Sequence, residues 1–201
     1  ISVDDVIYTV GSRLFAFKPD GSLLWKFPTG AEIFSNLRTA PIIDQSGALY
    51  LVAPQPTNNP FGSDNIIAYK FTPDSNGKPV WATTLDNQVL DNEGPSNSGG
   101  GNYGGGQPER WMYSSPAFSQ AEASLYIAVG NTINRVNTAS GEILWSLKPE
   151  GATGSFKASP VVDDQDNLFI GTKSNTEGTL FAIRADGTGL LWKEVIGADL
   201  Y

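Results

Sequence analysis

The side chains in this sequence that are best suited to acid–base or nucleophilic chemistry are carboxylates. The 201 residues include no His and no Cys, which excludes Ser-His-Asp and Cys-His catalysis, His-ligated zinc, disulfides and thiolate chemistry. Asp86, Glu93 and Glu109 fall in one segment. Two carboxylates about 5–10 Å apart across a bound sugar could cleave a glycosidic bond. The sequence gives no such distance, and the same residues equally fit a solvated loop.

Two short segments resemble ligand-binding motifs but lack essential parts of them. Asp164-Gln165-Asp166-Asn167 alternates like a calcium loop, yet it has neither the central Gly nor the terminal Glu of that loop. Residues 99–104 read G-x-G-x-x-G, but no strand and helix surround them to bind a phosphate. We therefore predict no catalytic, metal-binding or cofactor-binding residue in this chain.

The overall composition excludes several classes of partner. Thirteen Lys and Arg against 21 Asp and Glu give a net charge of −8, which opposes binding to nucleic acid. No run of about 18 apolar residues is present, so no membrane-spanning segment is expected. The hydrophobic fraction of 40% is sufficient for a packed core.

The sequence contains four copies of one repeat, and the strands and turns of each copy would position the side chains named above. Each copy contains short runs of β-branched and aromatic residues separated by Gly, Asp, Asn and Pro, the pattern of strands joined by tight turns. Four short strands in a repeat of about 45 residues indicate a propeller blade. We predict an all-β fold: a β-propeller of four-stranded antiparallel blades, about four of them present, within a seven- or eight-bladed ring. The expected blades span about 1–28, 38–84, 112–148 and 156–196 of a single region 1–201, with insertions at 53–64 and 86–110.

A Gly shortly before a Trp closes every copy. Fourfold recurrence suits packing between neighbouring blades better than a single ligand site, so we predict a structural role for both residues. The Gly would allow a tight turn, and the indole would be buried against the adjacent blade. The predicted structural residues are Trp25, Trp81, Trp145, Trp192, Gly21, Gly77, Gly141 and Gly189.

The best-formed copy carries a family resemblance. Residues 135–145 read Arg-Val-Asn-Thr-Ala-Ser-Gly-Glu-Ile-Leu-Trp, and Ser-Pro opens the last two copies. This pattern resembles the quinoprotein-like repeat of pyrroloquinoline-quinone (PQQ) dehydrogenases and of BamB-like propellers. The resemblance implies that the Trp lies on the outermost strand, and that the protein is secreted, periplasmic or on the cell surface. The dehydrogenases bind PQQ with calcium beside a vicinal Cys pair, which this sequence cannot form.

The two insertions provide the candidate partner-binding residues. Strands within a blade alternate in direction, so the connection from second to third strand and the connection between blades emerge on the same face. Long loops on a rigid scaffold are often functional, and Arg and aromatic residues are enriched at interface hot spots. The candidates are Phe61, Tyr103, Arg110 and Trp111, although Trp111 would equally fasten its loop to the disc.

These observations favour a non-catalytic propeller that binds another protein or acts as an assembly scaffold. Two alternatives remain open: a portion of a PQQ-dependent dehydrogenase, in which case PQQ and calcium would be bound, and a carbohydrate-binding or glycoside-hydrolysing propeller. Because four blades leave apolar blade faces open, we expect the ring to be completed by missing blades or by a second copy.

Overall fold

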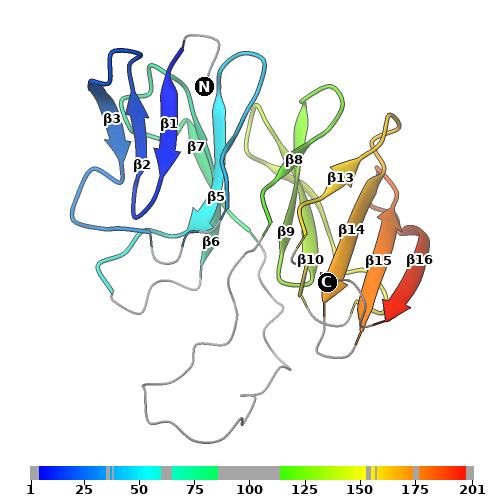
Figure 1. Cartoon of the computed structure of the whole chain (residues 1–201). Coiled ribbons are helices and arrows are strands. Elements are labelled where there is room, and N and C mark those ends of the chain that lie inside the picture. The colour runs from blue at the N-terminus through cyan, green and yellow to red at the C-terminus, as the bar shows by residue number, and fades with distance from the viewer. Residues whose placement is uncertain are drawn as a thin grey trace, which may run out of the picture.

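The computed structural model describes residues 5–34, 37, 39–59, 65–85, 114–152, 155–156, 158–173 and 177–197. Within these residues the regular secondary structure consists of β-strands, which form four antiparallel sheets that follow one another along the chain (Figure 1). Sheet 1 contains β1 (Ile7–Val10), β2 (Leu14–Phe17) and β3 (Leu23–Phe27). Sheet 2 contains β4 (Ile42–Ile43), β5 (Leu49–Pro54), β6 (Ile66–Phe71) and β7 (Trp81–Thr84). The predicted all-β class is confirmed.

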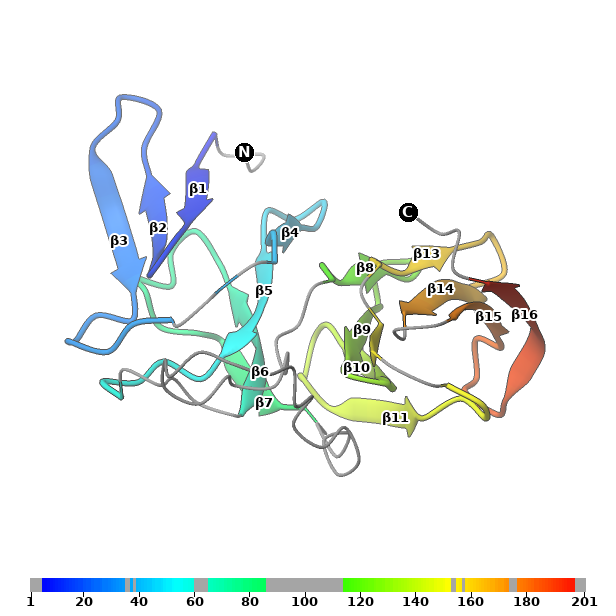
Figure 2. The ribbon, with the colours of Figure 1, turned by 60° about the horizontal axis from the view of Figure 1, so that its bottom comes forward.

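The other two sheets have the same order of strands. Sheet 3 contains β8 (Ala117–Phe118), β9 (Ser124–Val129), β10 (Thr132–Asn137) and β11 (Ile143–Leu147). Sheet 4 contains β12 (Ser155–Phe156), β13 (Val161–Val162), β14 (Leu168–Lys173), β15 (Gly178–Ile183) and β16 (Leu190–Gly197). The sheets spread like a fan, with the short strands β4, β8 and β13 on its inner side and β3, β7, β11 and β16 on its outer side (Figure 2).

Three details of the strands differ from the sequence-based expectation. The first strand of sheet 4 is divided into β12 and β13, which pair with opposite ends of β14. The described part of sheet 1 has three strands rather than four. Ala53 and Pro54, placed at the start of an insertion by the sequence, extend β5 because they pair with Ile67 and Ile66 of β6.

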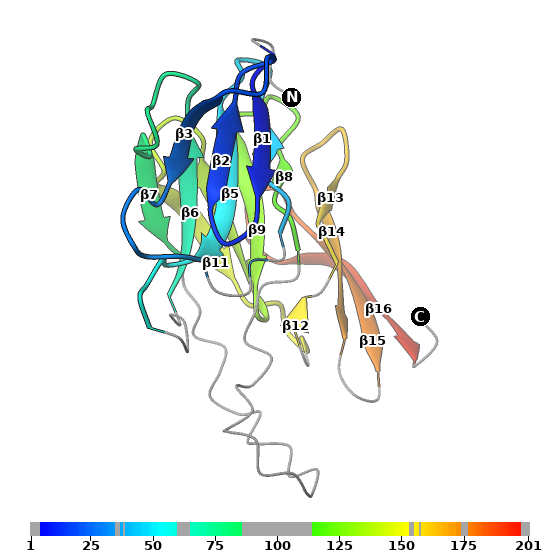
Figure 3. The same cartoon turned by 60° about the vertical axis from the view of Figure 1, so that its left-hand side comes forward.

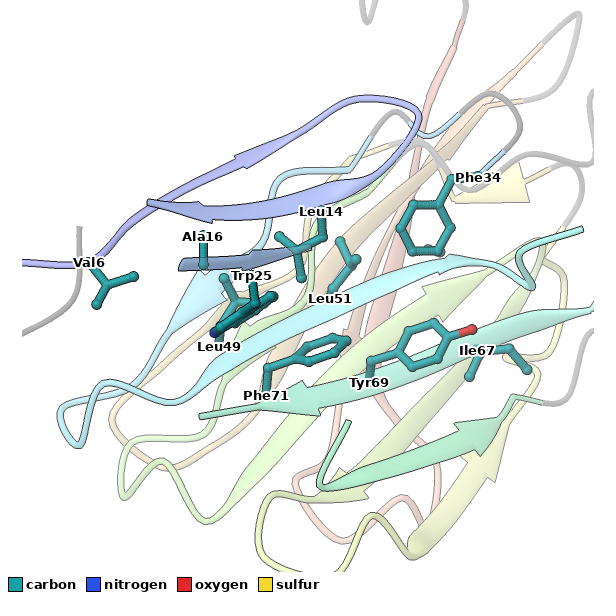
Figure 4. Packing of buried hydrophobic residues seen from close by; sticks show 11 residues of the cluster. Val6, Leu14, Ala16, Trp25, Phe34, Leu49, Leu51, Ile67, Tyr69 and Phe71 are labelled. Carbon is teal, nitrogen blue, oxygen red and sulfur yellow. The ribbon is translucent and has the colours of Figure 1, made fainter. Parts of the chain in front are cut away.

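The hydrophobic core consists of layers between successive sheets. Side chains on a strand alternate between its two faces, so Leu49 and Leu51 of β5 pack toward sheet 1 while Tyr50 and Val52 pack toward sheet 3. Figure 4 shows the first layer, in which Trp25 lies above Phe71 between the strands of sheets 1 and 2. A view from the side of sheet 1 shows these two sheets stacked face to face (Figure 3). Two further layers join sheet 2 to sheet 3 and sheet 3 to sheet 4.

Candidate functional site

A row of side chains runs across the last three strands of each sheet. In sheet 1 the strand pairing aligns Tyr8, Ala16 and Trp25, and the two ring centroids lie 5.8 Å apart. The corresponding ring pairs in sheets 2, 3 and 4 lie 6.0, 5.9 and 5.9 Å apart. The rows of those sheets are Tyr50–Lys70–Trp81, Tyr126–Arg135–Trp145 and Phe169–Ala182–Trp192.

The indole at the end of a row bonds to the next sheet along the chain. The Nε1–H of Trp25 donates to the carbonyl oxygen of Pro73 at 3.0 Å, and the Trp25 ring stacks on Phe71 with centroids 5.5 Å apart. Trp81 donates in the same way to the Thr138 carbonyl at 3.1 Å, and Trp145 to the Ala185 carbonyl at 3.2 Å.

The acceptor carbonyls occupy equivalent positions in their sheets. Each lies three residues after the middle member of its own row, as residue numbers 70 and 73, 135 and 138, and 182 and 185 show. Each of sheets 1 to 3 therefore gives one indole donor to a carbonyl acceptor at the equivalent position of the following sheet.

Trp192 differs from the other three because no further sheet is described after sheet 4. Its side chain is 46% exposed, against 6% for Trp25. Its indole N–H has no acceptor among the described residues. Among the described residues, no sheet covers the face of sheet 4 that carries Trp192.

Two cations reinforce the indole bonds that join sheet 2 to sheet 3 and sheet 3 to sheet 4. Lys70 Nζ donates to the Thr138 carbonyl at 3.0 Å, the same oxygen that accepts from Trp81. Arg135 Nη1 donates to the Ala185 carbonyl at 2.8 Å, beside Trp145. The cations also lie 5.3 and 5.2 Å from the ring centroids of the Tyr residues in their rows, where a cation–π attraction contributes.

The Tyr126 hydroxyl ties sheet 3 to sheet 4. It donates to the carbonyl oxygen of Asp166 at 2.9 Å. Burial, helped by the charges of Asp166 and Asp163 and opposed by Arg135, raises the pKa of Tyr126 to about 12. The phenol therefore stays protonated and remains a donor at neutral pH.

Three glycines let the chain pass directly against the preceding sheet. Gly77, Gly141 and Gly187 have φ of 73°, 76° and 73°, a region that side chains disfavour. A Cβ added to them would lie 2.4 Å from the Lys26 carbonyl oxygen, 2.7 Å from Trp81 and 2.6 Å from Trp145, respectively. Gly21 has a similar φ of 82° but no atom within 4 Å of such a Cβ, since no sheet is described before sheet 1.

Gly187, rather than the predicted Gly189, therefore lies against the preceding Trp. Gly189 has nothing within 4 Å of an added Cβ. In the other sheets the Gly precedes the Trp by four positions, but in sheet 4 the two candidates precede Trp192 by five and three. The turn of sheet 4 is one residue longer: the backbone N–H of Arg184 donates to the carbonyl of Gly189, five positions on, whereas that of Lys18 in sheet 1 donates to the carbonyl of Ser22, four positions on.

Asp163 and the following segment 164–167, which alternates like a calcium loop, form a turn. Asp163 Oδ1 accepts the backbone N–H groups of Gln165 and Asn167 at 2.9 and 2.7 Å. The side-chain hydrogen bond from Asn167 leads the causes that hold the pKa of Asp163 below its ordinary value. Among the residues with described structure, no three acidic side chains gather closely enough to hold a metal ion.

Acidic side chains in these turns also join neighbouring sheets. Glu122 Oε2 accepts the backbone N–H of Gln45 at 3.0 Å, and Asp166 Oδ1 accepts that of Gln120 at 2.7 Å. Glu122 and Asp166 have left-handed φ of 53° and 63°, and Asp5, directly before sheet 1, has a φ of 56°. Asp5 thus occupies the corresponding place in the first repeat.

Serine hydroxyls join the inner ends of the sheets. The backbone N–H of Ala40 donates to Ser115 Oγ at 3.0 Å, and that of Ser115 donates to Ser159 Oγ at 3.1 Å. Both serines belong to the Ser-Pro pairs that open copies of the repeat. The Ser-Pro pairs predicted where a strand begins, but they did not predict that the Ser hydroxyl accepts a hydrogen bond from the preceding sheet.

The base of the first insertion lies on the face where β5 ends and β6 begins. Gln55 and Asn65 are joined there by backbone and side-chain hydrogen bonds of 2.8 and 2.9 Å. Ile33, in the connection after sheet 1, pairs with Thr57. The four predicted partner-binding residues, Phe61, Tyr103, Arg110 and Trp111, lie outside the described residues.

The repeat matches a known family along nearly its whole length. A family model described as outer membrane protein assembly factor BamB, of the PQQ-repeat type, matches residues 10–200. The chain belongs to this BamB-like family. The family resemblance predicted from residues 135–145 is confirmed. No curated protein matches the chain.

Solved structures show the same propeller fold as this BamB-like chain. A europium-containing methanol dehydrogenase has a TM-score of 0.55 and 12% identity, over 86% of this chain and 26% of that one. Hydrazine synthase of Kuenenia stuttgartiensis has a TM-score of 0.60 and 12% identity, over 98% of this chain and 48% of that one. The Dos1 propeller has a TM-score of 0.57 and 9% identity, over 94% of this chain and 44% of that one.

This likeness confirms the predicted β-propeller architecture and, at these identities, shows the fold alone. The BamB-like chain spans less than half the length of each of these structures. The part of the chain with described structure contains no helix long and apolar enough to cross a bilayer.

Proposed function

We propose that this chain is a non-catalytic β-propeller scaffold that binds another protein in a secreted, periplasmic or cell-surface assembly. The observation that supports this most is how the charged and polar groups between the sheets are used. Lys70 and Arg135 bond to backbone carbonyls, and Glu122 and Asp166 bond to backbone N–H groups, in every case across a sheet boundary.

Groups used in this way fix the positions of neighbouring sheets rather than take part in a reaction. A catalytic acid, base or nucleophile needs a free proton or lone pair aimed at a place where substrate can sit. The cations instead satisfy carbonyl oxygens that already accept an indole N–H. These contacts build a rigid support for loops, the arrangement with which many folds carry binding residues.

The face that carries the insertions is the proposed binding surface. The connection between β5 and β6 and the connection after β7 both leave the sheets on this face. The described base of the first connection is ordered by the Gln55–Asn65 bonds and the Ile33–Thr57 pair, and that of the second by the Leu85 N–H, which donates to the Ile66 carbonyl at 2.9 Å. Phe61, Tyr103, Arg110 and Trp111 remain the residues proposed to contact the partner.

Site-specific photo-crosslinking in the native host tests this surface. A photoreactive amino acid at position 103 or 111 should give one discrete crosslinked protein. The matched controls are positions 74 and 140, in turns between third and outermost strands on the opposite face, and they should give none. Equal yields from both faces, or no adduct from either insertion position, would contradict a partner on the insertion face.

Two assays on the purified chain test the two catalytic alternatives. Likeness to a methanol dehydrogenase is likeness of fold, so we expect no saturable change in cofactor absorbance when PQQ and calcium are added. We likewise expect no glycoside hydrolysis that a Glu109→Gln change abolishes. Saturable PQQ binding with alcohol-dependent reduction, or hydrolysis lost in that variant, would overturn the non-catalytic proposal.

A further inference from the structure

Each sheet has a Gly in the turn that leads into its outermost strand, and the residue before that Gly differs between sheets. It is Asp20 in sheet 1, Asn76 in sheet 2, Ser140 in sheet 3 and Asp186 in sheet 4. Asn76–Gly77 is the only Asn-Gly pair in the 201-residue sequence. Sheet 2 is therefore the one sheet in which a side-chain amide directly precedes this Gly.

The backbone N–H of the Gly is also used differently in sheet 2. Those of Gly21, Gly141 and Gly187 each donate to a carbonyl three or four positions earlier, at 2.9, 2.9 and 3.0 Å. The N–H of Gly77 has no acceptor among the described residues. An amide nitrogen whose N–H is not hydrogen-bonded exchanges its proton more readily than a bonded one, and its deprotonated form is a nucleophile.

The side chain before the Gly is held in sheets 1 and 4 but not in sheet 2. Asp20 Oδ1 accepts the backbone N–H and the hydroxyl of Ser22 at 2.9 and 2.6 Å. Asp186 Oδ1 accepts the same two groups of Thr188 at 2.9 and 2.8 Å. Asn76 is exposed, and its carboxamide makes no hydrogen bond with a described residue. The Asn76 side chain can therefore turn toward the nitrogen that follows it.

One hydrogen bond closes the turn that contains Asn76 and Gly77. Their φ angles of 53° and 73° are both left-handed, as in a type I′ turn. The Lys78 N–H donates to the Ser75 carbonyl at 3.0 Å across this turn. A left-handed φ is tolerated by Asn but still costs free energy. Opening the turn therefore breaks a single bond and relieves this strain.

We propose that Asn76 is a site of spontaneous deamidation in the folded protein. The backbone nitrogen of Gly77 attacks Cγ of Asn76. The N–Cγ bond forms, the Cγ–Nδ2 bond breaks, and ammonia leaves with the proton of the attacking nitrogen. Water then opens the five-membered imide at one of its two carbonyl groups. The product is aspartate or isoaspartate at position 76, and in isoaspartate the main chain runs through the former side-chain methylene.

The additional main-chain atom of isoaspartate falls where the structure leaves no space. Gly77 is buried, and even a Cβ on it would overlap the carbonyl oxygen of Lys26 in sheet 1. The same turn carries the Pro73 carbonyl, which accepts the Trp25 indole N–H at 3.0 Å. A longer main chain here must shift one or both of these contacts, because close-packed groups have no room to absorb it. The modification therefore loosens sheet 1 from sheet 2.

Peptide mapping by mass spectrometry of the folded chain, kept at mildly alkaline pH, measures this modification. We expect the peptide with residue 76 to convert from amide to acid, mainly as isoaspartate, while Asp20 and Asp186 keep their normal linkage. The rate should lie within about tenfold of that in the urea-unfolded chain, because one turn hydrogen bond opposes ring closure. A folded chain that keeps its amide for longer than this would overturn the proposal.

The Asn76→Ser chain is the matched control, because Ser precedes Gly in the equivalent turn of sheet 3 and cannot form the imide. Circular dichroism melts before incubation show that this variant is folded. After equal incubation, hydrogen exchange of the sheet 1 amides should be faster in the unmodified chain and unchanged in the Asn76→Ser chain. The same change in both chains would overturn the assignment to residue 76. Complete conversion with unchanged exchange would overturn the loosening of sheet 1.

Discussion

Replacing Trp25 by Ala should uncouple sheet 1 from sheet 2. The indole is 6% exposed, stacks on Phe71 and donates to the Pro73 carbonyl. Burying about 200–250 Å² of aromatic surface at about 25 cal/mol per Å² gives roughly 5–6 kcal/mol as an upper value. Measured Trp-to-Ala changes in cores cost about 3–5 kcal/mol, and we expect a loss in unfolding free energy within that range.

Two companion variants divide this loss into its parts. Trp25→Phe keeps a ring against Phe71 but removes the N–H, so it should cost less than the Ala change, with about 1 kcal/mol from the lost bond. Trp192→Ala removes a side chain that is 46% exposed and has no described acceptor, so it should cost about 2 kcal/mol or less.

Denaturant melts measure the unfolding free energy of all three variants. Hydrogen exchange should show faster opening of sheet 1 amides in Trp25→Ala, because the described contacts of sheet 1 are with sheet 2. Equal losses for Trp25→Ala and Trp192→Ala would refute the reasoning that the indole acts through the next sheet.

Three further changes test other parts of the sheet contacts. Gly187→Ala should cost about 1–3 kcal/mol more than Gly21→Ala in melts, because both have left-handed φ but only Gly187 lies against Trp145; equal costs would contradict the close contact. Arg135→Met should lower stability by about 1.5–3 kcal/mol, since Arg135 donates to Ser124 and to the Ala185 carbonyl; an unchanged melt would show that these bonds contribute nothing. Asp163 has a pKa lowered from 3.8, mainly by the Asn167 side chain, so its contribution is present above that value and is lost as pH falls below it. Asp163→Asn should therefore flatten the loss of stability between about pH 5 and pH 2, and an unchanged acid slope would argue against the turn bonds.

The sequence was sufficient to predict what depends on local pattern. Alternating apolar runs and turn residues give strands, and the fourfold recurrence of Trp gives equivalent sheets. The period of the repeat identified a propeller, because a sheet with two apolar faces must stack on its neighbours to bury them.

Features that depend on register between sheets could not be predicted. The acceptor of Trp25 lies 48 positions away in the sequence, and no local pattern singles out the Pro73 carbonyl. Arg135 donates across the sheet boundary beside Trp145, and no local pattern indicates this contact. Gly187 was missed because a longer turn shifts the spacing to Trp192.

Hydrogen exchange of the indole N–H protons tests the central claim, that each sheet is fastened to the next by a Trp donor. The measurement uses the ¹⁵N-labelled chain, with signals assigned by single Trp-to-Phe changes. The Nε1–H protons of Trp25, Trp81 and Trp145 should exchange slowly and that of Trp192 at nearly the rate of an exposed indole. Similar fast exchange at all four positions would contradict the claim.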